Sequence, residues 1–168
     1  MGIGSFDTAV PTEPVLFPKN TSALIGPEEA IVIPAFLLDY RFDRLRTDYE
    51  AELAFIIKDR CKNLSPETAI DHVLAYTAFN DVSQRNLQHW DKSGWWRGKS
   101  LDTFAPIGPQ LVLAEDISNF ENLAIQCRLN GKIVQESNTS EMIFKLTEVI
   151  SFISKNFTLL PGDIISTG

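Results

Sequence analysis

The segment "RTDYEAELAFII" (residues 46–57) constrains the fold most, because it sets carboxylates inside a run of interior residues. Its apolar members, such as Leu53 and Phe55, favour a buried β-strand. Side chains alternate between the two faces of a strand, and residues two apart stand about 7 Å apart on one face. The segment therefore predicts that the carboxylates of Glu50 and Glu52 point together from a buried strand.

Two ionised carboxylates in an apolar setting repel each other, so they need protons, basic partners or a cation. Oxygen ligands with no nearby His or Cys favour Mg²⁺ or Mn²⁺, with Ca²⁺ as a substitute, over zinc. The best candidate for a third ligand is Asp81, in "FNDVSQR" after the next predicted strand. The alternative is that Glu50 and Glu52 face solvent on an edge strand, near Arg44 or Arg46.

The remaining patterns predict an α+β fold in which strands predominate. Around Asn130 and Gly131, two alternating runs predict a β-hairpin. "SPETAIDHVLAY" predicts a helix of about eight residues with Ser65 as N-cap, ending near Leu74. "TEVISFISKN" predicts a second helix with Thr147 as cap, and "LLPGDIIST" starts another strand. The Trp-rich "HWDKSGWWRGKSLD" has no period and predicts a loop.

Composition limits the class of protein. A chain of 168 residues with 44% hydrophobic residues suffices for one core, so residues 1–168 are expected to form a single domain. A net charge of -7 with scattered Lys and Arg lacks the basic patch that nucleic acid or an anionic membrane would need. Cys61 and Cys127 are too few for a disulfide framework and lack metal-ligand spacing. These features favour a cytoplasmic protein, with a mitochondrial one as the alternative.

Six separated segments match one known family in order and spacing: "EPVLFPKN", "DYEAELAFII", "YTAFNDVSQRNLQ", "RGKSLDTFAPIGP", "LNGKIVQESNTSEMIF" and "LLPGDIISTG". From about Glu13 to Gly168 the chain resembles the catalytic C-terminal domain of the fumarylacetoacetate hydrolase family. The resemblance implies a mixed β-sandwich roll, a homodimer and Mg²⁺ or Mn²⁺ in a carboxylate site. Members of the family cleave carbon–carbon bonds in β-diketo acids, decarboxylate oxaloacetate-like acids or isomerise related enols.

By this resemblance, Glu50, Glu52 and Asp81 match the metal ligands of the family. Lys99 matches the lysine of its "GKS.DTF.P.GP" segment, where an ammonium binds a substrate carboxylate or stabilises a developing enolate. The resemblance thus implies that Lys99 is catalytic and binds substrate. Taken alone, a lysine in a polar loop is usually solvated.

Three further polar residues match the family. Arg85 and Gln88 match the residues after the aspartate and would bind and orient the substrate; the alternative is a solvated helical turn. Lys19 matches the lysine after "LF", but its alternative is a surface charge, and we assign it no catalytic role.

Two departures from the family pattern bear on the reaction. The family carries a His and Glu acid/base pair before "EPVLFPK", where this sequence reads "MGIGSFDTAV", and it continues beyond the position of Gly168. The sequence is therefore expected to be an incomplete domain, truncated at both ends. A missing general base favours decarboxylation or enol tautomerisation over hydrolysis.

Three interpretations follow from the sequence. The first is a metal-dependent enzyme acting on β-keto or β-diketo acids. The second is a metal-binding remnant without turnover. The third is a scaffold of the same family whose dimer surface is its function.

Overall fold

The computed structural model describes residues 10–89 and 95–168. The strands in these ranges are β1 (Leu24–Ile25), β2 (Thr47–Asp48), β3 (Ala51–Ile57), β4 (Val73–Asn80), β5 (Ser83–Gln84), β6 (Ala105–Pro106), β7 (Val112–Leu113), β8 (Ala124–Leu129), β9 (Lys132–Asn138) and β10 (Ile164–Ser166). The α-helices are α1 (Pro66–Ala69), α2 (Arg85–Gln88), α3 (Trp96–Lys99) and α4 (Leu146–Asn156). Short 3-10 helices are η1 (Thr21–Ala23), η2 (Ala35–Tyr40), η3 (Ile70–His72), η4 (Ala114–Asp116) and η5 (Thr139–Glu141).

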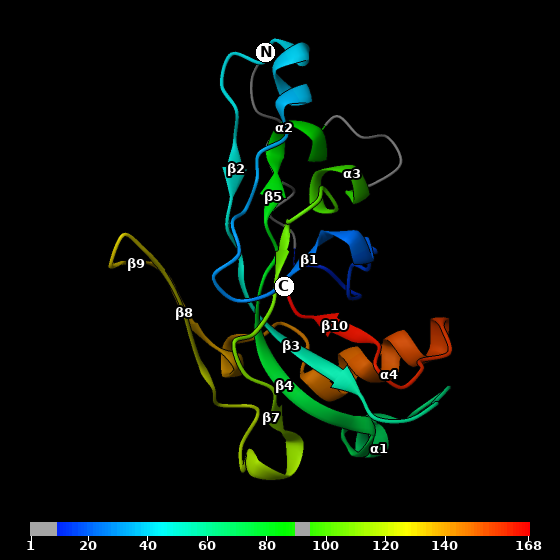
Figure 1. The fold of residues 1–168 in the computed structure, drawn as a ribbon. Coiled ribbons are helices and arrows are strands. Elements are labelled where there is room, and N and C mark those ends of the chain that lie inside the picture. Colours follow the sequence, from blue (N-terminus) through cyan, green and yellow to red (C-terminus); the bar gives the residue numbers. More distant parts are fainter. Residues whose placement is uncertain (1–9, 90–94) are drawn as a thin grey trace.

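An antiparallel sheet with the strand order β10-β3-β4-β7 forms the centre of the described structure. Figure 1 shows α4 beside β10 and β3, at the end of the sheet where α1 also lies. Phe55 and Ile57 of β3 and Tyr76 of β4 pack in one core cluster with Ile150 and Ile153 of α4. Burial of this apolar helix face holds α4 on the sheet. The fold is α+β with strands predominating, as the sequence predicts.

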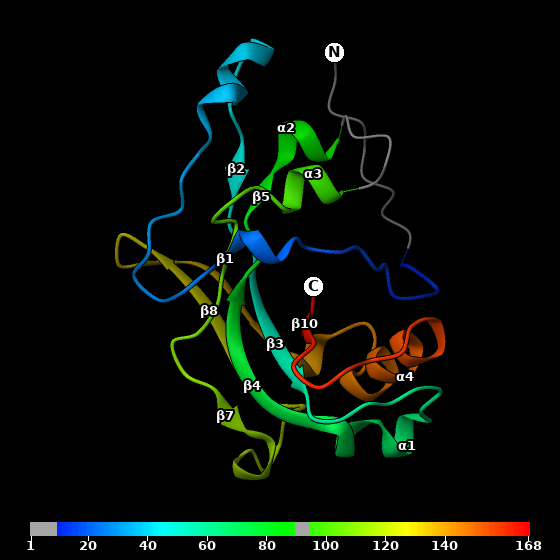
Figure 2. The same ribbon diagram turned by 45° about the vertical axis from the view of Figure 1, so that its right-hand side comes forward.

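Three two-stranded pairs surround the central sheet: β1 with β6, β2 with β5, and β8 with β9. The β8–β9 pair confirms the predicted hairpin. Its turn residues Asn130 and Gly131 have φ angles of 51° and 79°, and a tight two-residue hairpin needs both to be positive. The hairpin extends away from the central sheet in both Figure 1 and Figure 2.

The predicted helix after Ser65 is shorter than expected. α1 ends at Ala69, η3 follows, and β4 already begins at Val73. Val73 pairs with Ile57 across the sheet. Strand pairing therefore prevails over the local helical pattern from Val73 onward. Ser65 precedes the helix as predicted, although its side chain makes no capping hydrogen bond.

Two other local predictions need correction. α4 begins at Leu146 with Lys145 as its N-cap, not Thr147. The carboxylate of Glu148 accepts the backbone N–H of Lys145 at 2.8 Å, and buried Leu146 anchors the first turn in the core. The Trp-rich segment is not wholly a loop, because α3 forms within it; residues 90–94, including Trp90, lie outside the described residues.

No helix in residues 10–89 or 95–168 is long and apolar enough to cross a membrane.

Candidate metal and substrate site

The register of β3 against β4 builds the carboxylate cluster. Glu52 pairs with Phe79, and the backbone N–H of Asp81 donates to the carbonyl of Glu50 at 2.9 Å. Partners in register and residues two apart share one face of a sheet. Glu50, Glu52 and Asp81 therefore point to the same side, and one carboxylate oxygen of each lies within 4.8 Å of the others.

This cluster does not lie on a solvent-facing edge strand. β3 runs between β10 and β4, Glu52 is 7% exposed and Asp81 is 1% exposed. Only Glu50 is partly open to solvent, with its side chain 25% exposed. The cluster thus needs internal compensation for its negative charge.

Arg85 provides part of this compensation. Its backbone N–H donates to the carbonyl of Arg46. This hydrogen bond continues the pairing of β2 with β5 by one residue. Its guanidinium donates to Asp48 at 2.8 Å, to Glu50 at 2.5 Å and to the side-chain oxygen of Gln88 at 2.9 Å. Burial works to lower the pKa of Arg85, but hydrogen bonds and charges from Asp48 and Glu50 raise it above its usual value.

Lys99 enters the cluster from α3. Its Nζ donates to Asp81 at 2.6 Å and also contacts Glu50, and its side chain is 3% exposed. α3 can pack closely against α2 because Gly98 has no side chain. A Cβ at Gly98 would lie only 2.7 Å from the backbone nitrogen of Gln88. Lys99 is therefore a buried part of the site, not a solvated loop lysine.

Lys19 contacts the carboxylate cluster at Asp81. Its Nζ lies 2.5 Å from Asp81 and also donates to the backbone carbonyl of Lys99, and its side chain is 15% exposed. The surface-charge alternative is therefore wrong. Burial lowers the pKa of Lys19, with the Asp81 charge opposing that shift. The match to the lysine after "LF" was the available signal for this position.

Ser166 also contacts the cluster, and the sequence patterns did not indicate it. Its hydroxyl donates to Glu52 at 2.5 Å, from β10 on the far side of β3. Its place after the apolar pair Ile164 and Ile165 offered only a weak signal. Burial raises the pKa of Glu52 to about 8, and the charges of Asp81 and Glu50 add to that shift while the Ser166 hydrogen bond opposes it.

These residues fit a hard divalent cation. Among the described residues, no basic side chain makes a salt bridge to Glu52, so this buried carboxyl prefers to hold a proton. A cation bound by the three carboxylates would replace that proton and both lysine contacts. Oxygen donors alone suit Mg²⁺, Mn²⁺ or Ca²⁺ better than zinc.

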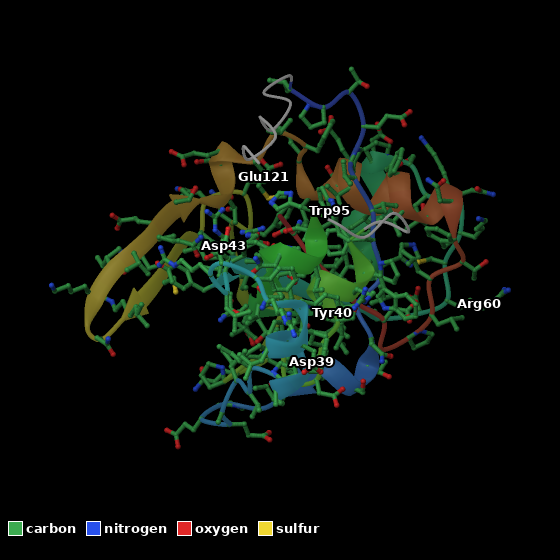
Figure 3. All side chains as sticks on the ribbon, turned by 90° about the horizontal axis from the view of Figure 1, so that it is seen from above. Asp39, Tyr40, Asp43, Arg60, Trp95 and Glu121 are labelled. Atoms are coloured by element: carbon green, nitrogen blue, oxygen red, sulfur yellow. The ribbon has the colours of Figure 1, made fainter. Side chains whose placement is uncertain are left out.

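The described residues also form two surface hollows. One of about 360 Å³ is lined by Phe36, Asp39 and Tyr40 of η2, and Figure 3 labels the last two. The other, of about 170 Å³, borders α3 at Trp96 and Arg97, among other residues. The residues that line these two hollows do not include the carboxylates.

We expect the affinity for Mg²⁺ to rise with pH up to about pH 8. Below that pH, Glu52 holds a proton because burial raises its pKa to about 8, and a cation must displace this proton to bind. One displaced proton weakens binding about tenfold per pH unit below the pKa and has no effect above it. Calorimetric titration across this range measures the slope. A flat affinity profile would contradict the assignment of Glu52 as a ligand.

Comparison with known proteins shows which family the chain matches. A family model described as "Fumarylacetoacetate (FAA) hydrolase C-terminal" matches residues 3–168. Over 161 residues, 95% of the chain, it is 46% identical to a mitochondrial oxaloacetate tautomerase from Xenopus laevis, and it covers 48% of that protein. The chain therefore spans about half the length of this relative.

Solved structures give the same picture. The chain is similar to a fumarylacetoacetate hydrolase from psychrophilic Exiguobacterium antarcticum, with 36% identity, a TM-score of 0.85, and coverage of 96% of this chain and 56% of that one. It is also similar to a 5-carboxymethyl-2-hydroxymuconate delta-isomerase from Mycobacterium smegmatis, with 35% identity, a TM-score of 0.84, and coverage of 97% and 61%. These similarities confirm the fold type that the sequence resemblance implied.

Proposed function

The chain belongs to the fumarylacetoacetate hydrolase family, and on that premise we propose that it is a divalent-metal-dependent enzyme of β-keto acids. The reaction that we favour is the keto–enol tautomerisation of an oxaloacetate-like acid. The second candidate is the decarboxylation of such an acid. The observation that carries the proposal is the convergence of three carboxylates with the buried ammonium of Lys99. The name of the Xenopus relative, an oxaloacetate tautomerase, supports the choice of substrate class.

Glu50, Glu52 and Asp81 would hold the cation, with Mg²⁺ or Mn²⁺ as the first choices. When bound, such a cation supplies Lewis-acid polarisation of a keto acid's oxygen atoms.

Lys99 would stabilise the negative charge that develops on the substrate oxygen when a proton leaves the neighbouring carbon. Its ammonium is buried beside two carboxylates, and a fixed charge is worth more in such a setting than in water. Lys19 adds a second positive charge on the other side of Asp81. The same two lysines favour an anionic substrate over a neutral one.

Arg85 and Gln88 would orient the substrate. Three N–H groups of Arg85 hold Asp48, Glu50 and Gln88 in place, which leaves two of its five donors for a substrate carboxylate. The side-chain oxygen of Gln88 accepts a hydrogen bond from Arg85, so the amide N–H groups of Gln88 can face the substrate.

The proton balance favours tautomerisation over hydrolysis. Tautomerisation moves one proton between carbon and oxygen through a proton carrier, solvent water included, so it consumes no water and needs no base that activates a water nucleophile. Hydrolysis adds the elements of water across a carbon–carbon bond and requires that base. The three carboxylates and the cationic groups of Lys19, Lys99 and Arg85 suit the first reaction better.

Four broader predictions accompany this function. We propose that residues 1–168 form a single domain of the family, that the protein is a homodimer and that it acts on a small molecule without nucleic-acid or membrane partners. The cytoplasm remains the predicted compartment; the Xenopus relative is named as mitochondrial.

A substrate panel with and without metal tests the proposal. We expect Mg²⁺ or Mn²⁺ to accelerate enol–keto conversion or decarboxylation of oxaloacetate, and chelator to abolish the effect. Acylpyruvates and fumarylpyruvate should react slowly or not at all. Efficient acylpyruvate cleavage in the presence of chelator would overturn both the reaction and the ligand assignment. Metal binding without turnover on any substrate would overturn the proposed activity and favour a metal-binding remnant of the family.

A further inference from the structure

A second cluster of metal-ligating side chains lies at the other end of the β3–β4 pair. Asp59 and Cys61 follow β3, and His72 precedes β4. One ligand atom from each of the three residues lies within 4.8 Å of the others. Nδ1 of His72 is 2.5 Å from Oδ1 of Asp59. The spacing of the cysteines in the sequence gave no indication of this cluster, because the chain loop between residues 58 and 72 brings it together.

The backbone holds this cluster in place. The N–H of Lys58 donates to the carbonyl of His72 at 2.8 Å, which closes the loop at its base. Cys61 and Leu159 exchange both backbone hydrogen bonds at 3.0 Å. The Cβ positions of Cys61 and His72 are thus set by strand pairing rather than by free loop conformations.

This cluster is separate from the carboxylate site. β3 runs from Ala51 to Ile57, and a strand rises about 3.3 Å per residue, so the two sites lie on the order of 20 Å apart. Figure 3 shows Arg60, which stands between Asp59 and Cys61, at the edge of the molecule, away from Trp95 at the start of the α3 segment.

We propose that Asp59, Cys61 and His72 form a binding site for a zinc-class divalent ion. A thiolate, an imidazole and a carboxylate are the donor types that Zn²⁺ and Co²⁺ prefer, whereas the all-oxygen cluster at Glu50 suits harder cations. Three protein ligands leave the fourth position of a tetrahedral ion open to water.

The burial of the three side chains suits ion entry from solvent. Cys61 is 6% exposed and fixed by the core, the His72 side chain is 25% exposed, and the Asp59 side chain is 52% exposed. Asp59 is therefore free to turn from its hydrogen bond with His72 toward an ion, without rearrangement of the core. An ion bound there would link the loop after β3 to the start of β4 and so add to the stability of the folded state.

The same residue types also make up cysteine nucleophile triads, but the environment does not favour that use. Burial, helped by the charges of Asp59 and Asp163, raises the pKa of Cys61. A reactive cysteine needs a lowered pKa and access to substrate. An ion supplies the positive charge that this thiol lacks.

Cobalt titration tests the site, because a thiolate bound to Co²⁺ gives a charge-transfer absorption that an all-oxygen site cannot give. We expect the band to saturate at one ion per chain, to vanish in Cys61→Ser and to require about tenfold or more Co²⁺ in Asp59→Asn. Zn²⁺ should displace the band. Cys127→Ser and Glu50→Ala are the matched controls and should retain it. This readout does not depend on turnover. It therefore tests the second site whether or not the proposed enzyme activity is found.

Asp59→Asn keeps the test valid even if Cys61→Ser folds poorly, because the Asp59 side chain is half exposed. No charge-transfer band with the wild-type protein would overturn the proposal. A band that persists in Cys61→Ser, or that is unchanged in Asp59→Asn, would overturn it as well.

Discussion

Replacement of Lys99 by Met is expected to lower turnover of a β-keto acid by roughly 10² to 10³-fold, the usual cost of losing one preorganised group that stabilises developing oxyanion charge. The ammonium of Lys99 lies buried against Asp81 and Glu50, so no solvent cation can take its place. Metal binding should be retained, because Lys99 supplies no ligand atom and its ammonium no longer competes with the cation for Asp81 and Glu50. Steady-state kinetics at saturating Mn²⁺ measure the loss.

Lys132→Met is the matched control, since Lys132 is exposed on the β8–β9 hairpin, and it should leave turnover unchanged. Turnover by the Lys99→Met variant at the wild-type rate would remove the catalytic role of Lys99. A parallel loss of metal binding would point instead to a disrupted site.

Replacement of Asp81 by Asn is expected to lower the free energy of unfolding by about 3 to 5 kcal/mol in the presence of chelator. Asp81 is 1% exposed and pairs with both Lys19 and Lys99, and removal of one partner from a buried ion pair leaves an uncompensated charge. Asn is close in shape to Asp, so the loss reports charge rather than packing. Urea unfolding measures it.

Asp116→Asn serves as the control for this measurement, because Asp116 is exposed in η4. Its effect should stay within about 0.5 kcal/mol. An equally small effect for Asp81→Asn would mean that the lysine pairs add nothing to the stability of the metal-free protein.

Part of this site could be predicted because it depends on local periodicity. In an extended backbone, the alternation in residues 46–57 places Glu50 and Glu52 on one face. The Asn130 and Gly131 turn likewise specifies its hairpin locally, through two residues that tolerate positive φ.

Other parts depend on contacts between distant segments, which no local pattern encodes. Lys19 meets Asp81 across 62 residues of sequence, and Ser166 meets Glu52 across 114. α1 ends early because β4 pairs with β3 from Val73 onward. Cys61 and His72 converge only because strand pairing closes the loop between them. In each case, tertiary packing decides what the side chain contacts.

Anomalous scattering from crystals grown with Mn²⁺ would locate a cation held by the three carboxylates. We expect one strong anomalous peak within bonding distance of carboxylate oxygens from Glu50, Glu52 and Asp81, with the ammonium groups of Lys19 and Lys99 displaced from their contacts with Asp81. A map with no peak among the three carboxylates at saturating Mn²⁺, and both lysines still paired with Asp81, would contradict the assignment of these ligands.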